Sequence, residues 1–285
     1  MRLRMLIIGV LVPVVIYAVA YAYGAARWAA QTRTLRARLD SARTPVQQQT
    51  VDFSDLAGLP DPVQRYFRAV LTDGQPVVTG VTVEHTGTFN MSATAEQWQP
   101  FTSDQWVVTT RPGFVWNGQV SVLPGVPARV HDAYTAGEGI LHVALLGLVS
   151  VTDLRGAGAL AEGELMRYFA EATWYPTALL PSQGVAWAVG DNRSAYGTLT
   201  DGDTTITLLF TFNDQGLIDT VQTEARGRTV DGEMVPTPWR GRFWNYAERN
   251  GMLVPLDGEV AWLLPEGVQP YWRGHIVDID YELAR

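Results

Sequence analysis

Apolar and polar residues alternate one by one along much of this chain, as in strands with one buried and one wet face. Residues 81–91 (VTVEHTGTFNM) show the alternation clearly, and His85 falls on their apolar face. Residues 203–213 (DTTITLLFTFN) repeat it, and 275–283 (HIVDIDYEL) place Val277 on the buried face. Turn dipeptides such as Asp-Gly and Asn-Gly separate these segments without a βαβ rhythm, which predicts an antiparallel meander.

Two segments follow a helical period instead. Within residues 59–71 (LPDPVQRYFRAVL), apolar side chains recur every three or four positions, which predicts an amphipathic helix over 61–71. Residues 163–181 (GELMRYFAEATWYPTALLP) predict a second helix over about 160–175, ended by Pro176. A long, twisted antiparallel sheet with few helices curls. We therefore expect a mainly β (α+β) fold: a curled, half-barrel sheet with helices covering its concave side.

The N-terminal segment is long enough to cross a membrane. No charged residue occurs in residues 5–26, and 22 helical residues span about 33 Å against a bilayer core of roughly 30 Å. We expect a transmembrane anchor over 1–27, with Trp28 at the interface, although Ala20-Tyr21-Ala22 also resembles a signal-peptide cleavage site. The predicted location is the cell membrane, crossed once.

We expect an anchor, an Arg-rich linker over 28–58 and a single β-rich domain over 59–285 that begins with the first amphipathic helix, and the charge is unevenly distributed along them. Residues 1–50 hold seven Arg and one Asp, a net charge of +6. The chain totals −8, so the remainder carries −14 and repels nucleic acid. By the positive-inside rule, the Arg residues after the span place the domain in the cytoplasm. Its acidic, cysteine-free and Trp-rich composition favours an extracytoplasmic position, which is the one we expect.

The composition excludes several kinds of catalytic, metal-binding and covalent site. The chain contains neither Cys nor Lys, which excludes disulfides, thiolate sites and Schiff-base lysines. Neither a G-x-S-x-G, a Walker nor a G-x-G-x-x-G motif occurs. The four His residues lack metal-ligand spacing, and the acidic face of 278–282 is typical of a solvated edge. We expect no metal and no cofactor.

Three charges interrupt the second helix. At 100° per residue, Glu164, Arg167 and Glu171 lie within about 60° of one another. They form either a structural ionic seam or a carboxylate pair for acid–base work. Arg167 between them would keep both carboxylates ionised, whereas a general acid needs a raised pKa. We favour the structural interpretation and assign no catalytic residue; His131 and Asp132 are adjacent in sequence and so point to opposite sheet faces.

The aromatic residues permit two interpretations. Nine Trp residues lie along the domain and either fill a large core or line a cavity for an apolar ligand. The candidate cavity or lid residues are Phe169, Trp174, Tyr175, Trp187, Trp239, Trp244 and Trp262.

Several sequence blocks, in order, carry a resemblance. They are LPDPVQRYF, RPGFVWNG, LLGLVSVTD, GELMRYFAEATWYPTALLPSQGVAW, DGDTTITLLFTFN, VPTPWRGRF and GEVAWLLPEGVQPYWRGHIVDIDYE. Over roughly residues 59–282 the chain resembles an uncharacterised bacterial family whose members carry an N-terminal membrane segment. At the level of fold it is more loosely similar to lipoprotein carriers of the LolA and LppX type. It departs from those carriers in lacking a lipidated cysteine and in having a membrane helix.

These observations favour a membrane-tethered, non-enzymatic domain that binds a lipid or another apolar ligand. The membrane is contacted through residues 5–26. One alternative is an envelope enzyme that uses Glu164 and Glu171, or His131. Another is a structural module that binds a protein partner.

Overall fold

Thirteen strands make up a single sheet in the computed structural model, which describes residues 2–92, 95–230 and 232–285, with side chains from Leu11 onward. The strands are β1 (Val78–Asn90), β2 (Trp98–Val108), β3 (Gly113–Leu123), β4 (Val126–Thr135), β5 (Glu138–Leu145), β6 (Val149–Gly156), β7 (Ala186–Asp191), β8 (Ser194–Asp201), β9 (Thr204–Phe212), β10 (Ile218–Val230), β11 (Glu233–Arg249), β12 (Met252–Leu264) and β13 (Gly267–Leu283). Every described pairing is antiparallel.

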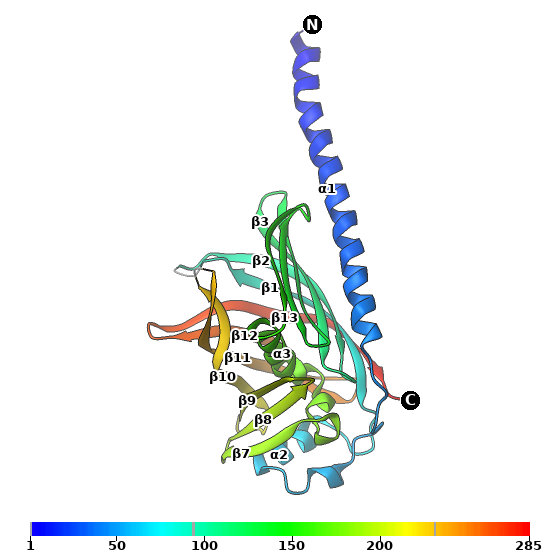
Figure 1. Cartoon of the computed structure of the whole chain (residues 1–285), viewed down its shortest axis with the longest axis vertical. Coiled ribbons are helices and arrows are strands. Elements are labelled where there is room, and N and C mark those ends of the chain that lie inside the picture. The colour runs from blue at the N-terminus through cyan, green and yellow to red at the C-terminus, as the bar shows by residue number, and fades with distance from the viewer. Residues whose placement is uncertain (1, 93–94, 231) are drawn as a thin grey trace.

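The sheet consists of two meanders joined side by side. Strands β1–β6 form one half and β7–β13 the other, and the halves meet where β1 pairs with β13. Strands β6 and β7 form the two open edges, so the sheet curls without closing (Figure 1). The predicted curled antiparallel sheet is confirmed.

Helices occupy the hollow between the two halves. The chain passes from β6 to β7 through α3 (Ala159–Glu171) and the 3-10 turns η2 (Ala172–Trp174), η3 (Pro176–Leu179) and η4 (Pro181–Gln183). Helix α3 packs against β4 and β5 of one half and β9 and β10 of the other. Helix α2 (Asp61–Val70) follows η1 (Phe53–Leu56) and covers the lower end of the hollow (Figure 1). The predicted covering helices are therefore present.

The main core lies between the sheet and these helices. Among its fully buried side chains are Tyr66 and Phe67 of α2, Phe169 of α3, and Phe210 of β9. Each belongs to an apolar stripe that the sequence shows at a helical or strand period, so burial of this stripe positions the elements.

One predicted orientation on β13 is wrong. Val277 was expected on the buried face but is 59% exposed, whereas Ile276 is buried. The pairing with β1 shifts here, because Glu84 lies opposite Asp278 and His85 lies opposite Ile276. This bulge adds one residue to β13 and changes which side chains face inward.

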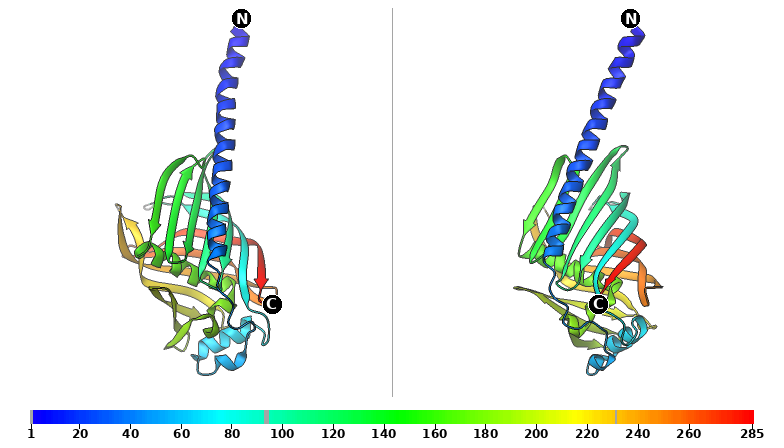
Figure 2. Two further views of the ribbon diagram at one scale, coloured as in Figure 1. Left: turned by 45° about the vertical axis from the view of Figure 1, so that its right-hand side comes forward. Right: turned by 90° about the vertical axis from the view of Figure 1, so that its right-hand side faces the viewer.

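A long helix, α1 (Arg2–Ser41), lies on the outer face of the sheet (Figure 2). Its N-terminal part projects beyond the domain, and its C-terminal part packs against β2, β3 and β4. The buried positions 24, 28, 32, 35 and 39 recur at helical spacing and form one stripe. Residues 28–41, expected as part of a linker, thus continue the helix and lie against the domain.

Trp28 is the largest side chain of this stripe and is 1% exposed. Its indole stacks on His131 of β4, with ring centroids 3.9 Å apart, and its Nε1 donates to Asn117 Oδ1 at 2.9 Å. Thr32 Oγ1 lies 2.8 Å from His131 Nε2. Trp28, expected at the membrane interface, is therefore buried between α1 and the outer face of the sheet. Helix α1 is long and apolar enough to be a candidate membrane span, by length and composition.

Candidate functional site

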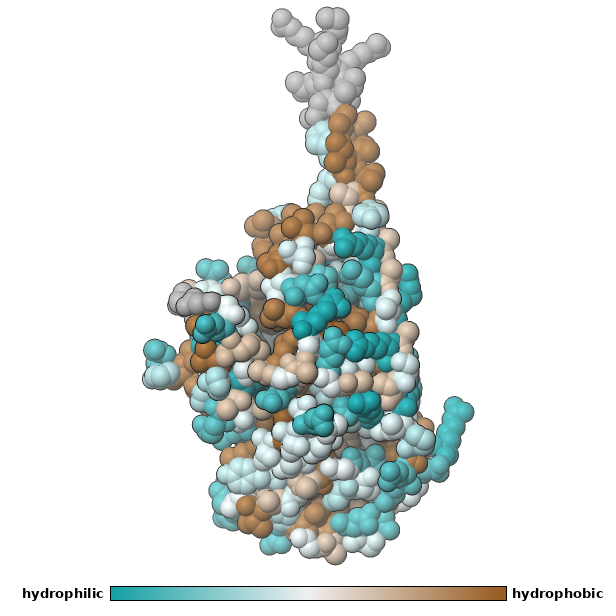
Figure 3. Space-filling model, viewed as in Figure 1, coloured by the Kyte–Doolittle hydropathy of each residue, from teal (hydrophilic) through white to brown (hydrophobic). Residues whose placement is uncertain are grey.

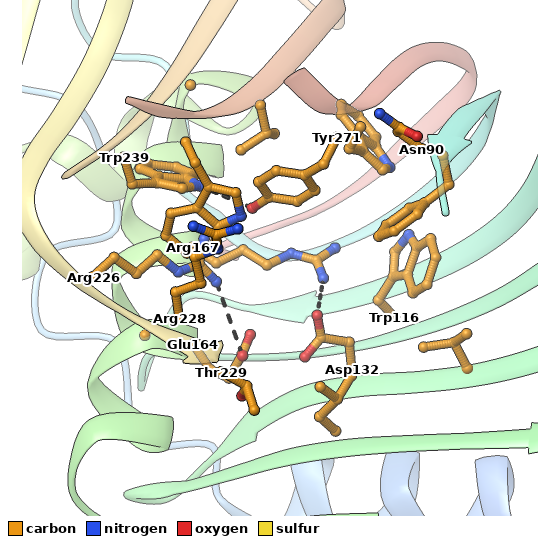
Figure 4. Close-up of a pocket in the computed structure, with 18 of the residues that line it drawn as sticks. Asn90, Trp116, Asp132, Glu164, Arg167, Arg226, Arg228, Thr229, Trp239 and Tyr271 are labelled. Carbon is orange, nitrogen blue, oxygen red and sulfur yellow. Dashed lines mark hydrogen bonds and ion pairs between the residues drawn. The ribbon is translucent and has the colours of Figure 1, made fainter. Parts of the chain in front are cut away.

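A cavity of about 510 Å³ lies in the hollow between α3 and the inner faces of both halves of the sheet (Figure 4). Its wall comes from β1, β3, β4, β5 and β6 on one side and from β10–β13 on the other. Most of this wall is apolar or aromatic; examples are Phe89, Trp116, Val143, Trp239, Val260 and Trp262.

Small residues on α3 help to leave this space open. Gly163 and Ala170 both face the cavity, and a Cβ placed on Gly163 would lie 3.6 Å from Arg226 Nε. The helix therefore closes one side of the hollow without filling it. On the opposite strands, the rings of Trp116, Trp239 and Tyr271 border the cavity (Figure 4).

Arg167 of α3 is the best-connected charge at the cavity. Its guanidinium pairs with Asp132 Oδ2 of β4 at 2.5 Å and with Glu171 Oε1 at 2.7 Å, and it donates to Gln105 Oε1 of β2 at 3.3 Å. Gln105 in turn donates to Glu171 Oε2 at 2.7 Å. Burial by itself would lower the pKa of Arg167, but the carboxylates of Glu171 and Asp132 raise it above its ordinary value.

Glu164, one turn earlier on α3, is in a different electrostatic position. It is 6% exposed, and its nearest cation is Arg226 of β10, with Nη2 3.9 Å from Oε1. Burial, followed by repulsion from Asp132, raises the pKa of Glu164 well above its usual range, and Arg226 offsets this only in part. The sequence-based expectation that Arg167 holds Glu164 ionised is therefore wrong.

Aromatic rings surround the second guanidinium. Arg226 lies over the face of Trp239 at 4.9 Å, and Trp239 Nε1 donates to Tyr271 Oη at 2.9 Å. Tyr271 stacks on Trp262, with centroids 5.5 Å apart. Arg228, two residues along β10, lies over Trp262 at 5.8 Å. Strands β10–β13 thus present two guanidinium groups on an aromatic wall.

The structure brings three of the seven candidate ligand-binding residues to the cavity: Trp174, Trp239 and Trp262. The other four lie elsewhere. Phe169 packs on Phe210 in the core at 5.2 Å, and Tyr175 is buried with its hydroxyl donating to Tyr168 O. Trp187 packs against Phe67 and Phe210, and Trp244 is 39% exposed.

The other candidate residues from the sequence lie on opposite faces of the sheet. The three seam residues Glu164, Arg167 and Glu171 all line the cavity, together with Asp132. His131 faces the outside of the same strand and is covered by α1, as expected for neighbours in a strand. Burial, with His142 and Arg155 nearby, lowers the pKa of His131 to about 3.

Sequence reasoning did not identify Asp132, Arg226, Tyr271 or Trp116 as part of one site. The available signal was weak: Arg226 and Arg228 are same-face neighbours near the end of a strand, a common surface pattern. Within the described residues, no group of three or more His, Asp or Glu side chains is arranged to hold a metal ion.

Comparison with known proteins adds a family and a fold likeness. Residues 57–281 match a family described as "Family of unknown function (DUF6920)". No curated protein matches the chain. A LolA superfamily protein from Nitrosomonas europaea is similar at 10% identity and a TM-score of 0.42, covering 79% of this chain and 94% of that one.

Two other solved structures are similar to a smaller degree. A β-barrel-like protein with a domain of unknown function (DUF1849) from Brucella abortus has 10% identity and a TM-score of 0.20, covering 72% of this chain and 99% of that one. A porin-like protein from Bacteroides uniformis has 8% identity and a TM-score of 0.22, with coverages of 72% and 97%.

Proposed function

The chain belongs to this family of unknown function (DUF6920), and we propose from its cavity that it is a membrane-tethered domain that binds an acyl chain or a similar apolar ligand. The observation that carries the proposal is the cavity itself. Its volume of about 510 Å³ lies within the range of about 300–1,000 Å³ that is usual for small-ligand sites. Its largely apolar wall with a few convergent charges also matches such sites.

An acyl chain fits this wall energetically. Burying each methylene contributes about 0.8 kcal/mol, so enclosing ten methylenes contributes roughly 8 kcal/mol before the cost of ordering the chain. The rings of Trp116, Trp239 and Trp262 offer broad apolar faces for this contact. Four charged groups, Asp132, Glu164, Arg167 and Arg226, lie together where α3 meets β4 and β10, so an amphiphile has separate places in the cavity for its chain and its head.

Helix α1 is the proposed tether. Residues 5–26 contain no charge, and the exposed side chains from Leu11 to Tyr23 are almost all apolar or aromatic. We place the domain outside the cytoplasm, which is supported by the net charge of −14 over residues 51–285 and by the lack of cysteine. Protease treatment of intact cells tests this placement, because an extracytoplasmic domain is digested and a cytoplasmic one is protected.

The binding proposal is tested by mass spectrometry of lipids extracted from the purified full chain. We expect a co-purified amphiphile in the wild type and its loss in Val143→Phe, which fills the cavity from β5. The matched control is Val277→Phe, whose side chain points to solvent. A wild-type protein free of lipid, and indifferent to added fatty acid, would contradict the proposal.

One observation favours a second candidate, acid–base catalysis on a cavity-bound ligand. Glu164, with its raised pKa, lies beside Asp132 in a concave site, and perturbed pairs of this kind are frequent at catalytic centres. An enzyme would convert an added envelope-lipid extract to new products, and Glu164→Gln would stop this conversion. A binding protein returns the lipids chemically unchanged in both forms.

A further inference from the structure

Arg226 is a buried cation that is only weakly paired among the described residues. The residue is 8% exposed, and within the described part of the chain its guanidinium makes no hydrogen bond. Its ion pair with Glu164 is long, at 3.9 Å, and its guanidinium lies over the face of Trp239. A buried charge is costly unless it is paired and hydrogen-bonded.

Arg167 shows what a fully paired guanidinium looks like in the same cavity. Asp132 and Glu171 contact it at 2.5 and 2.7 Å, and Gln105 accepts a further hydrogen bond. Asp132 and Glu171 are thereby committed to Arg167. Glu164 is the acidic side chain left near Arg226, and its burial beside Asp132 favours the neutral form.

We propose that Arg226 binds the anionic headgroup, a carboxylate or phosphate, of an amphiphile whose acyl chain occupies the cavity. Arg guanidinium groups bind such oxygens through two parallel hydrogen bonds, a geometry for which Arg226 has free donors. Arg228 lines the same wall and supplies a second positive charge at the headgroup. This inference rests on the proposed function and specifies its ligand class.

The test compares ligands that share a C16 chain and differ in the headgroup. Native mass spectrometry of the delipidated full chain measures the occupancy by palmitate, hexadecyl phosphate and hexadecanol. Hydrogen bonds to charged groups contribute about 1.5–3 kcal/mol, so we expect the anionic ligands to bind about 10- to 100-fold more tightly than the alcohol. Inorganic phosphate is added as a separate ligand, because binding of phosphate alone would indicate a free-anion site and overturn the amphiphile assignment.

Variants test whether Arg226 is the source of the preference for an anionic headgroup. Arg226→Gln should remove the preference for palmitate, while the affinity for hexadecanol stays within about twofold of the wild-type value. Arg226→Lys should retain part of the preference for palmitate. Arg242→Gln, at an arginine side chain 56% exposed, is the matched control and should change nothing. Equal binding of palmitate and hexadecanol by the wild type would overturn the headgroup inference and leave the apolar cavity standing. Failure of all three C16 ligands to bind would instead contradict the proposed function.

Helix α1 contacts two hairpin turns of the sheet, and these contacts support a second, independent inference. The hydroxyl of Tyr17 donates to the carbonyl of Gly125 in the β3–β4 turn, and Gly24 packs against Leu146 in the β5–β6 turn. Uncharged residues 5–16 thus lie beyond the first contact, and 12 helical residues span about 18 Å. A bilayer core is roughly 30 Å thick, so the span must also use the part of α1 that lies beside the hairpins.

The two hairpins are suited to that environment. Residues 113–128 and 139–152 contain no Asp, Glu, Lys or Arg, in a domain that is otherwise acidic. At and near the tips, Leu123, Val149 and Val151 are each more than 60% exposed. Figure 3 shows apolar surface gathered at this end of the domain, beside α1.

We infer that the tips of the β3–β4 and β5–β6 hairpins enter the bilayer interface beside α1. The partner is a lipid surface, and its polar headgroup layer can satisfy the backbone groups of the turns. The inner faces of these same strands line the cavity, through Val120, Ala128 and Val143. One wall of the cavity is therefore formed by strands that reach the bilayer, and this bilayer would supply the amphiphile.

Because the chain has no cysteine, single labels test this cleanly. The full chain is reconstituted in nanodiscs of phosphatidylcholine and phosphatidylglycerol, with an environment-sensitive fluorophore on Leu123→Cys. We expect quenching by doxyl-labelled lipids and protection from aqueous iodide. Val189→Cys, 73% exposed on edge strand β7, is the control and should show the reverse. Equal accessibility of both labels to iodide would overturn the inference, and it leaves the cavity proposals untouched.

Discussion

Arg167 on α3 and Asp132 on β4 are joined by an ion pair of 2.5 Å inside the hollow of the sheet. The two side chains are 15% and 16% exposed, so little solvent screens them. Through Gln105 the same guanidinium also reaches β2. This network ties the central helix to the β1–β6 half, next to the space that we assign to the ligand.

Breaking this pair should be costly. Removing one partner of a buried ion pair leaves the other charge unpaired, with a typical loss of about 3–5 kcal/mol. We expect Arg167→Gln to lower the free energy of unfolding by about 3 kcal/mol, measured by urea titration of the full chain in detergent. Arg155→Gln, in an exposed pair with Asp153, is the control and should change it by less than about 1 kcal/mol.

Replacing Glu164 should instead raise the free energy of unfolding, by an amount that depends on pH. Its pKa is raised in the folded chain, so the folded state keeps a proton that the unfolded state has released. Stability is therefore lost as the pH rises above the unfolded pKa of about 4.3, until the folded pKa is passed. Glu164→Gln removes this loss, and its stability relative to the wild type should increase from pH 4 to pH 8.

The measurement is the urea midpoint of both proteins at a series of pH values. Glu162→Gln, an exposed glutamate on the same helix, provides the control, and its difference from the wild type should stay nearly flat over this range. A Glu164→Gln variant that is less stable than the wild type at pH 8 would show that the carboxylate is needed in its charged form.

Trp28 should anchor the outer helix to the sheet. Truncating a buried Trp costs about 3–5 kcal/mol, and here the change also removes the stacking on His131 and the bond to Asn117. We expect Trp28→Ala to release residues 28–41, seen as faster amide hydrogen exchange there. Trp244→Ala, at an indole 39% exposed, should leave this exchange unchanged. Unaltered protection in Trp28→Ala would mean that the other stripe residues suffice for docking.

The sequence allowed the sheet and its covering helices to be predicted, because alternation and helical period depend on neighbouring residues. It did not reveal the bulge that exposes Val277, since that depends on pairing with β1, nearly 200 residues away. The docked stripe of α1, including Trp28 and Leu35, is visible at helical spacing but was obscured by the surrounding arginines.

The candidate site was harder to predict for a related reason. Glu164 and Arg167 could be placed on one face of a helix from their spacing alone. Their partners Asp132 and Arg226 come from strands of different halves, and tertiary packing alone sets those contacts. The pKa of Glu164 consequently differs from what helix neighbours alone predict, because burial and Asp132 outweigh Arg167.

Gly24 should be intolerant of a side chain because the β5–β6 turn lies directly against it. A Cβ at this position would collide with the backbone at Leu146 and lie 2.9 Å from the side chain of Leu148. Overpacking of this kind costs about 1–3 kcal/mol, so Gly24→Val should lower the thermal unfolding temperature of the detergent-solubilised full chain. Ala26→Val, on the exposed side of the same helix, controls for the general effect of valine in a helix. Equal unfolding temperatures for the two variants would show that α1 can move away from the turn without loss, and would weaken the case that helix and hairpins enter the bilayer together.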